Sequence, residues 1–210
     1  MHNSNSVDLE GLEALYGPLA ESIRRLIDVS IRTEVGADVV AAATARIETV
    51  ADDLSASLTP GSLGIRQATD GRVVAWGNAV IGLRNPVAPP LSVHHETDGS
   101  VWAEFTLGAA YEGPENHVHG GVCALILDHV LGATAHLPGR PAVTGTLTIR
   151  YRRGTGLGRP LRARAHVERV EGVKTFAEGW IEDDDGVTVE ANGIFIHPRR
   201  ADPGRIDGEI

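Results

Sequence analysis

The chain has 210 residues, of which 42% are hydrophobic and 22% charged, as in an ordinary globular protein. Its formal net charge of −9 argues against general nucleic-acid binding, which depends on neutralising phosphates. Because there is no apolar run of roughly 18–20 residues, no secretory signal pattern and a single cysteine, Cys123, the sequence predicts a cytoplasmic protein without a membrane span.

Residues 9–58 predict two helices separated by Gly36. Asp38 can cap the second helix, and Thr59-Pro60-Gly61 ends the segment because Pro and Gly break helices. Apolar side chains recur three and four positions apart on both, which predicts one apolar face for each helix: Leu12, Leu15, Tyr16, Leu19, Ile23, Leu26 and Ile27, then Val39, Ala43, Ile47, Val50 and Leu54. We expect residues 1–60 to form a helical extension that serves packing or oligomerisation, or alternatively one that binds a partner or covers the substrate.

Beyond residue 61 the sequence turns to short segments rich in Val, Ile, Thr and aromatic residues, which predict strands. Asp98-Gly99 and Asp185-Gly186 are typical hairpin turns. The predicted strands are 72–81, 91–95, 101–107, 145–153, 161–170, 175–182 and 187–196. We expect residues 61–200 to form a second domain and residues 201–210 a C-terminal tail.

A single helix, residues 121–135, interrupts these strands. It is apolar almost all the way round, which predicts burial on most faces. Strands on both sides of one central helix indicate an α+β domain whose sheet wraps that helix. The hot-dog fold has this arrangement, although the pattern alone also allows a cystatin-like or another α+β roll.

Two features of this helix carry chemistry. Asp128 lies among apolar residues, where a carboxylate needs hydrogen bonds, a counter-charge or a solvated cleft. His119-Gly120-Gly121 stands at the start of the helix, where unpaired N–H groups can stabilise an oxyanion and the glycines let a carbonyl approach. The alternative is that these residues have only structural roles: Asp128 is a buried aspartate satisfied by hydrogen bonds, and His119 precedes an ordinary Gly-Gly turn without taking part in catalysis.

The spacing of these residues predicts a site built from two chains. His119 and Asp128 are nine residues apart, which is roughly 13 Å along a helix at 1.5 Å per residue. Asp128 therefore cannot easily serve the start of its own helix, whereas the carboxylate of an antiparallel partner chain can reach it. We expect a composite site at a two-fold interface, in a homodimer or a dimer of dimers.

Three segments, in order, resemble motifs of the PaaI-type hot-dog acyl-CoA thioesterases, closest to the branch of the mammalian mitochondrial acyl-CoA thioesterases. They are EGPENHVHGGVCALILD at residues 112–128, VTGTLTIRYRR at 143–153 and VEGVKTF at 170–176. The resemblance covers about residues 70–197 and implies hydrolysis of an acyl-CoA thioester without a cofactor or metal. It implies that the Gly121 N–H polarises the thioester carbonyl, that His119 supports the substrate, that Asp128 activates water and that Thr144 helps to hold that water.

Further substrate contacts follow from the same resemblance. Many relatives have an asparagine six residues before the HGG histidine, where this chain has Gly113; Asn116 is a candidate replacement. Residues 140–174 carry nine basic residues against two acidic ones, which suits the compact polyanion of coenzyme A. Candidate phosphate contacts are Arg152, Arg153 and Lys174, and Gly120 is expected to line the substrate carbonyl.

Three rival interpretations stay open. A zinc site is conceivable because His117, His119, Asp128 and His129 are ligand types, but it leaves the glycines without a role. An enoyl-CoA hydratase normally has an aspartate and a histidine about five residues apart near the helix start, a pair this chain does not have there. A non-catalytic acyl-CoA-binding or regulatory hot-dog protein would use the same pocket and leave Asp128 idle.

Overall fold

The computed structural model describes residues 9–67, 73–136 and 141–198. Internal contacts divide the chain into two compact units, residues 1–89 and 90–210, each described by itself below. The domain boundary that we expected after residue 60 stays a prediction. In the described residues, no helix is long and apolar enough to cross a membrane.

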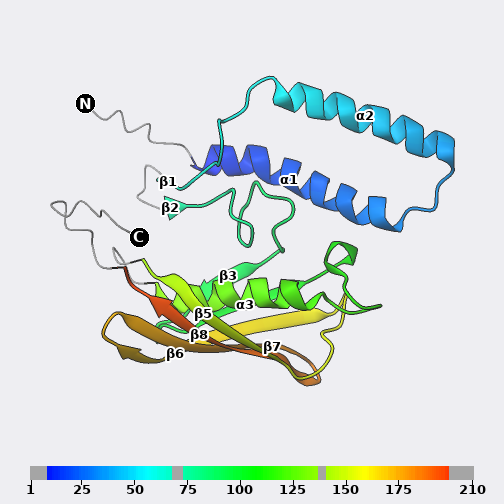
Figure 1. Ribbon diagram of the computed structural model, residues 1–210. Coiled ribbons are helices and arrows are strands. Elements are labelled where there is room, and N and C mark those ends of the chain that lie inside the picture. The colour runs from blue at the N-terminus through cyan, green and yellow to red at the C-terminus, as the bar shows by residue number, and fades with distance from the viewer. Residues whose placement is uncertain (1–8, 68–72, 137–140, 199–210) are drawn as a thin grey trace, which may run out of the picture. The chain divides into compact units, whose positions relative to one another are not determined.

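The first unit contains the two expected helices, α1 (Leu9–Arg32) and α2 (Ala37–Ser55), and a two-stranded ribbon of β1 (Arg66–Gln67) and β2 (Val73–Val74) (Figure 1). Leu9 of α1 and Trp76 form a small apolar cluster with Leu12, Leu63, Val74 and Leu83 packed against it. The apolar stripe of α2 is present, but none of its residues is buried. This helix therefore gains little stability from burial within the chain.

Two local predictions in this unit were wrong. Gly36, not Asp38, occupies the N-cap of α2, and Asp38 lies in the first turn. In the predicted strand 72–81, residue 72 lies outside the described residues and only β2 is extended. The Asn78 side chain accepts hydrogen bonds from the N–H groups of Val80 at 2.7 Å and Ile81 at 3.1 Å, which bends the chain into turns.

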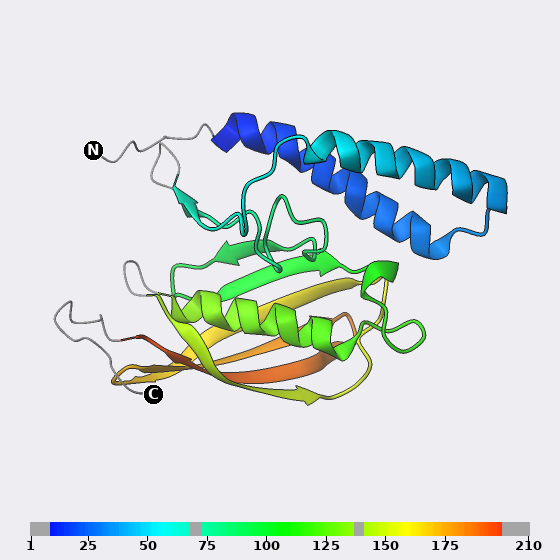
Figure 2. The same ribbon diagram turned by 45° about the horizontal axis from the view of Figure 1, so that its top comes forward.

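The second unit is an antiparallel six-stranded sheet with one helix, α3 (Gly120–Ala135), lying across one face (Figures 1 and 2). The sheet order is β3-β4-β6-β7-β8-β5. The strands are β3 (Ser92–His95), β4 (Val101–Thr106), β5 (Val143–Tyr151), β6 (Pro160–Glu171), β7 (Lys174–Asp183) and β8 (Gly186–Ile196). Together with α3 they form the α+β hot-dog fold that the sequence predicted.

Side-chain alternation explains why these strands pack against α3. In β4, Val101, Ala103 and Phe105 are buried beneath the helix while the intervening side chains face away. The buried side chains of α3 are almost wholly apolar. They include Cys123, Ile126, Leu127, Val130 and Leu131, all at most 1% exposed. Because apolar area removed from water contributes about 25 cal/mol per Å², the burial of these side chains stabilises the packing of α3 on the sheet.

Strand β5 forms one edge of the sheet and runs beside α3. Its neighbour is β8 on one side only, and the register shifts between Thr144 and Thr146. Leu147 and Ile149 share the face that packs against the core. The edge is largely exposed, with Val143 and Tyr151 each 54% accessible.

Candidate active site

The start of α3 is fixed by the loop before it. Glu112 and Val118 form a β-bridge, and the His119 N–H donates to the Tyr111 carbonyl at 2.9 Å. His119 is the N-cap of α3, and its Nδ1 accepts a hydrogen bond from the Gly121 N–H at 3.0 Å. This side chain therefore satisfies one of the N–H groups that a helix leaves open at its first turn.

At Gly113 the structure gives a physical reason for the glycine. A Cβ atom at this position would lie 2.6 Å from the Cα of His119. Any larger residue would push the loop away from the helix start. Asn116 adopts a left-handed conformation with φ of 60°, and its carbonyl accepts from the Leu157 N–H at 3.0 Å. Asn116 thus shapes the turn of this loop.

The Gly120 carbonyl is held from the side by β5. The Tyr151 hydroxyl donates a hydrogen bond to the Gly120 oxygen at 2.9 Å. A Cβ atom on Gly120 would lie 3.1 Å from the tyrosine ring, so this glycine lets the ring close over the helix start. The sequence held no signal that the Tyr151 hydroxyl reaches Gly120.

Asp128 lies half-buried on α3 and is paired with a residue of β5. The Thr144 hydroxyl donates to Asp128 Oδ1 at 2.9 Å. A hydrogen bond to a charged acceptor is stronger than a neutral one, so Thr144 orients this carboxylate. Asp128 and Thr144, which the resemblance gave separate roles, are therefore in contact within one chain.

His129, next to Asp128, is mostly buried. Burial lowers the pKa of His129, and His95 and His136 lower it further, while the neighbouring Asp128 carboxylate opposes this shift. The neutral imidazole is therefore favoured beside the candidate carboxylate.

The two ends of the candidate site are separated within the chain. Gly121 and Asp128 are seven residues apart on α3, which corresponds to about 10 Å along the helix axis. A single α3 therefore holds the two groups about two turns apart. Gly121, at the start of α3, and Asp128, near its middle, are thus separate parts of the candidate site in one chain.

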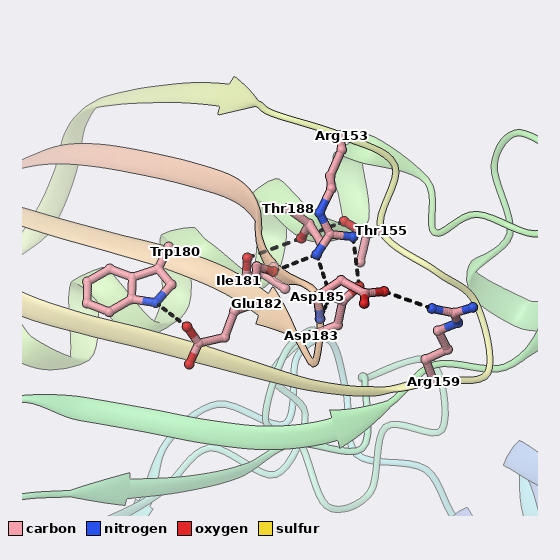
Figure 3. A network of polar contacts seen from close by, with 10 residues as sticks. Arg153, Thr155, Arg159, Trp180, Ile181, Glu182, Asp183, Asp185 and Thr188 are labelled. Atoms are coloured by element: carbon pink, nitrogen blue, oxygen red, sulfur yellow. Dashed lines mark hydrogen bonds and ion pairs between the residues drawn. The ribbon is translucent and has the colours of Figure 1, made fainter.

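The basic residues nominated for phosphate binding do not converge in the single chain. Arg152 pairs with Glu190 at 2.7 Å, and Lys174 stands opposite Glu171 at the far end of the sheet. Arg153 is held by Asp183 and by the Gly186 carbonyl, as Figure 3 shows for the carboxylate. This ion pair lowers the pKa of the Asp183 carboxyl, whose side chain is 4% exposed. Arg153 thus has a structural partner.

Arg159 is a basic residue that the sequence reasoning missed. It lines a hollow together with Asn116, His117 and Arg153, on the loops that flank the start of α3. Its ion pair with Asp185 is 3.4 Å long and exposed, so it holds the guanidinium weakly (Figure 3). The long loop between β5 and β6 gave no periodic signal from which this position could be inferred.

The two histidines of this loop, His117 and His119, are of a residue type that can bind zinc. His117 Nδ1 lies 2.8 Å from the Glu115 carbonyl oxygen, and His119 caps α3. Among residues 9–67, 73–136 and 141–198, no three His, Cys, Asp or Glu side chains are grouped so that they could hold a metal ion.

Comparison with known proteins identifies the family. Residues 115–190 match the thioesterase superfamily, a segment that includes the loop, α3 and most of the sheet. A crystal structure of a thioesterase superfamily protein superposes with a TM-score of 0.77 at 33% identity, over 86% of this chain and 90% of that one. The chain belongs to the thioesterase superfamily. The family that the three sequence motifs indicated is thereby confirmed.

Two more distant relatives were found. An acyl-coenzyme A thioesterase, THEM4, from Xenopus laevis is 34% identical over 94 residues, which is 44% of this chain and 42% of that protein. The chain thus matches less than half the length of this curated relative. A mutant structure of the phenylacetic acid degradation protein PaaI from Thermus thermophilus is 19% identical, with a TM-score of 0.48 over 51% of this chain and 93% of that one.

Proposed function

We propose that this thioesterase superfamily member hydrolyses an acyl-CoA thioester to the free acid and coenzyme A. The observation that carries this proposal is the contact of Thr144 with Asp128, which holds a half-buried carboxylate on an otherwise apolar helix. A carboxylate in this setting carries a desolvation cost that functional sites accept. The acyl-CoA thioesterase named among the relatives supports the choice of substrate class.

The chemistry needs one group at the start of α3 and one near its middle. Asp128 takes a proton from water, and the water oxygen attacks the thioester carbon. The negative charge that develops on the carbonyl oxygen is stabilised by the Gly121 N–H, a kind of donor worth about 3–4 kcal/mol in the transition state. The carbon–sulfur bond then breaks, and the thiolate of coenzyme A takes up the proton. No metal or cofactor is required for this acyl transfer to water.

The working site takes its two halves from two chains. Because β5 is an edge strand with one free side, a second copy can pair with it in antiparallel orientation around a two-fold axis. This pairing reverses one α3 relative to the other and brings the start of one helix toward Asp128 of its mate. The minimal unit is a homodimer, and two such dimers can associate further.

The coenzyme A phosphates lie on the basic loops beside the start of α3. Arg159 is the strongest candidate in one chain because its partner holds it weakly, and Asn116 shares its hollow. Lys174 lies near the Val143 end of β5, since both Lys174 and Val143 pair with Ile196. In the antiparallel dimer this end approaches the Arg152–Arg153 end of the partner strand, so Lys174 contributes across the interface.

Thiol release from a panel of acyl-CoA thioesters tests the proposal. We expect turnover by the wild-type protein and a loss of at least about a hundredfold in Asp128→Asn. Asp52→Asn is the matched control, because it makes the same chemical change on an exposed helix of the other unit. Acyl-CoA binding without turnover in the wild-type protein contradicts the proposal and favours a non-catalytic acyl-CoA-binding protein instead.

A further inference from the structure

The contact between Tyr151 and Gly120 acts on the group that the proposed mechanism uses. The carbonyl of Gly120 and the N–H of Gly121 are the two ends of one planar peptide group. The Tyr151 hydroxyl donates to that carbonyl at 2.9 Å, while the N–H at the other end points to His119 Nδ1 at 3.0 Å. A single peptide unit therefore lies between a donor from β5 and an acceptor from the loop.

Donation to the carbonyl changes the strength of the N–H as a donor. Hydrogen bonds in a chain polarise one another, with a strengthening of about 10–30% per bond. The carbonyl oxygen has two lone pairs, so it can accept the hydroxyl in addition to its helical N–H partner. The tyrosine hydroxyl thus draws electron density toward the Gly120 oxygen and makes the Gly121 N–H a better donor.

The same contact restricts the orientation of this peptide. Glycine has the most freedom of any residue, and two in succession leave the helix start free to reorient. The hydroxyl fixes one end of the peptide, and the ring packs 3.1 Å from the position of a Gly120 Cβ, so a side chain there would have to displace the ring. Tyr151 itself is fixed by β5, whose neighbouring side chains pack against the core.

The geometry points to Tyr151 as a positioning residue for catalysis: through the Gly120–Gly121 peptide it orients and strengthens the N–H that binds the developing oxyanion. This inference rests on the proposed function. Tyr151 does not touch the reacting atoms, and its effect falls on the transition state because only there is the carbonyl oxygen charged. If the contact only joined β5 to α3, its loss would lower the stability of the fold and leave the hydrogen-bonding strength of the Gly121 N–H unchanged.

Tyr151→Phe separates these roles because it removes the hydroxyl and keeps the ring. Applying a strengthening of 10–30% to one oxyanion donor predicts a fall in kcat of about two- to eightfold with KM nearly unchanged. The matched control is Tyr16→Phe, the same change in the other unit, where Tyr16 lies beneath Arg84. It should leave kcat unaltered.

A second measurement does not require turnover. In the amide NMR spectrum of the homodimer, the Gly121 proton should move upfield in Tyr151→Phe, since its hydrogen bond to His119 weakens, and stay in place in Tyr16→Phe. An unchanged Gly121 proton overturns the inference, as does an unchanged kcat when the proton moves. If the wild-type protein releases no thiol, the proposed function and the catalytic role of Tyr151 both fail, and a moved proton then supports only the coupling through the peptide.

Discussion

Complementation between two damaged chains tests the composite site directly. Asp128→Asn removes the base from the middle of α3, and Gly121→Leu places a side chain where the carbonyl must approach the start of the helix. Gly121 is exposed and helical, so leucine suits its backbone, although its Cβ approaches the His119 ring to 3.1 Å. Each variant alone should form a dimer in which both sites are damaged.

The mixed dimer has one intact site if the halves come from different chains. The undamaged helix start of the Asp128→Asn chain then faces the undamaged carboxylate of the Gly121→Leu chain. At equal amounts, random pairing makes about half of the dimers mixed, each with one working site of two, so activity recovers to about a quarter of wild type. As the proportion of the two chains changes, activity follows a parabola with its maximum at equal amounts.

A site within one chain predicts a different curve. If Gly121 and Asp128 of the same chain formed the site, each chain of the mixed dimer would carry one damaged group, and both sites would be inactive. The assay is thiol release after co-refolding or co-expression over a series of mixing ratios, with dimer formation checked by size-exclusion chromatography. No recovery at any ratio, in samples that do contain mixed dimers, refutes the composite site.

Three further substitutions probe the neighbouring contacts. Thr144→Val removes the donor to Asp128 and should lower kcat by about tenfold or more, measured by thiol release, because a hydrogen bond to a charged group is worth about 1.5–3 kcal/mol. Arg153→Gln should lower the melting temperature at neutral pH. This deficit should disappear in acid, since the lowered pKa of Asp183 contributes stability that is lost as pH falls through the folded-state value. His129→Gln should flatten the loss of stability below about pH 6.5 in denaturant titrations, because a histidine whose folded pKa is lowered favours unfolding there.

The strands and α3 were predictable because burial imposes a period on the sequence. In β5 the half-buried Leu147 and Ile149 alternate with exposed residues, and the continuous apolar run of α3 indicated a sheet around it. Where the predicted strand did not form, a single side chain caused the difference. Asn78 binds backbone N–H groups two and three residues ahead and turns a β-rich segment, an effect that strand propensity does not include.

The site residues were nominated from motifs, but their contacts depend on segments distant in sequence. The loop that brings Gly113 against the Cα of His119 forbids a side chain at residue 113, and no pattern in the sequence encodes that approach. Arg153 looked available for phosphate because its partner, Asp183, lies 30 residues away across the sheet. Local sequence therefore identified which residue types carry charge, while the fold decided which charges were already neutralised.

The hydrogen bond from the Gly121 N–H to His119 Nδ1 affects how strongly the proposed enzyme binds the transition state relative to the substrate. A thioester carbonyl that takes the Gly121 N–H must displace His119 Nδ1, and losing a helix cap costs about 1 kcal/mol. A neutral carbonyl gains little more than this, whereas an oxyanion gains about 3–4 kcal/mol from a well-placed donor. The exchange is therefore nearly neutral for bound substrate and favourable once charge develops, which is the condition for raising kcat rather than lowering KM. His119→Ala should accordingly lower the KM of the thioester, because the carbonyl no longer competes with the ring, and an increased KM would contradict this account.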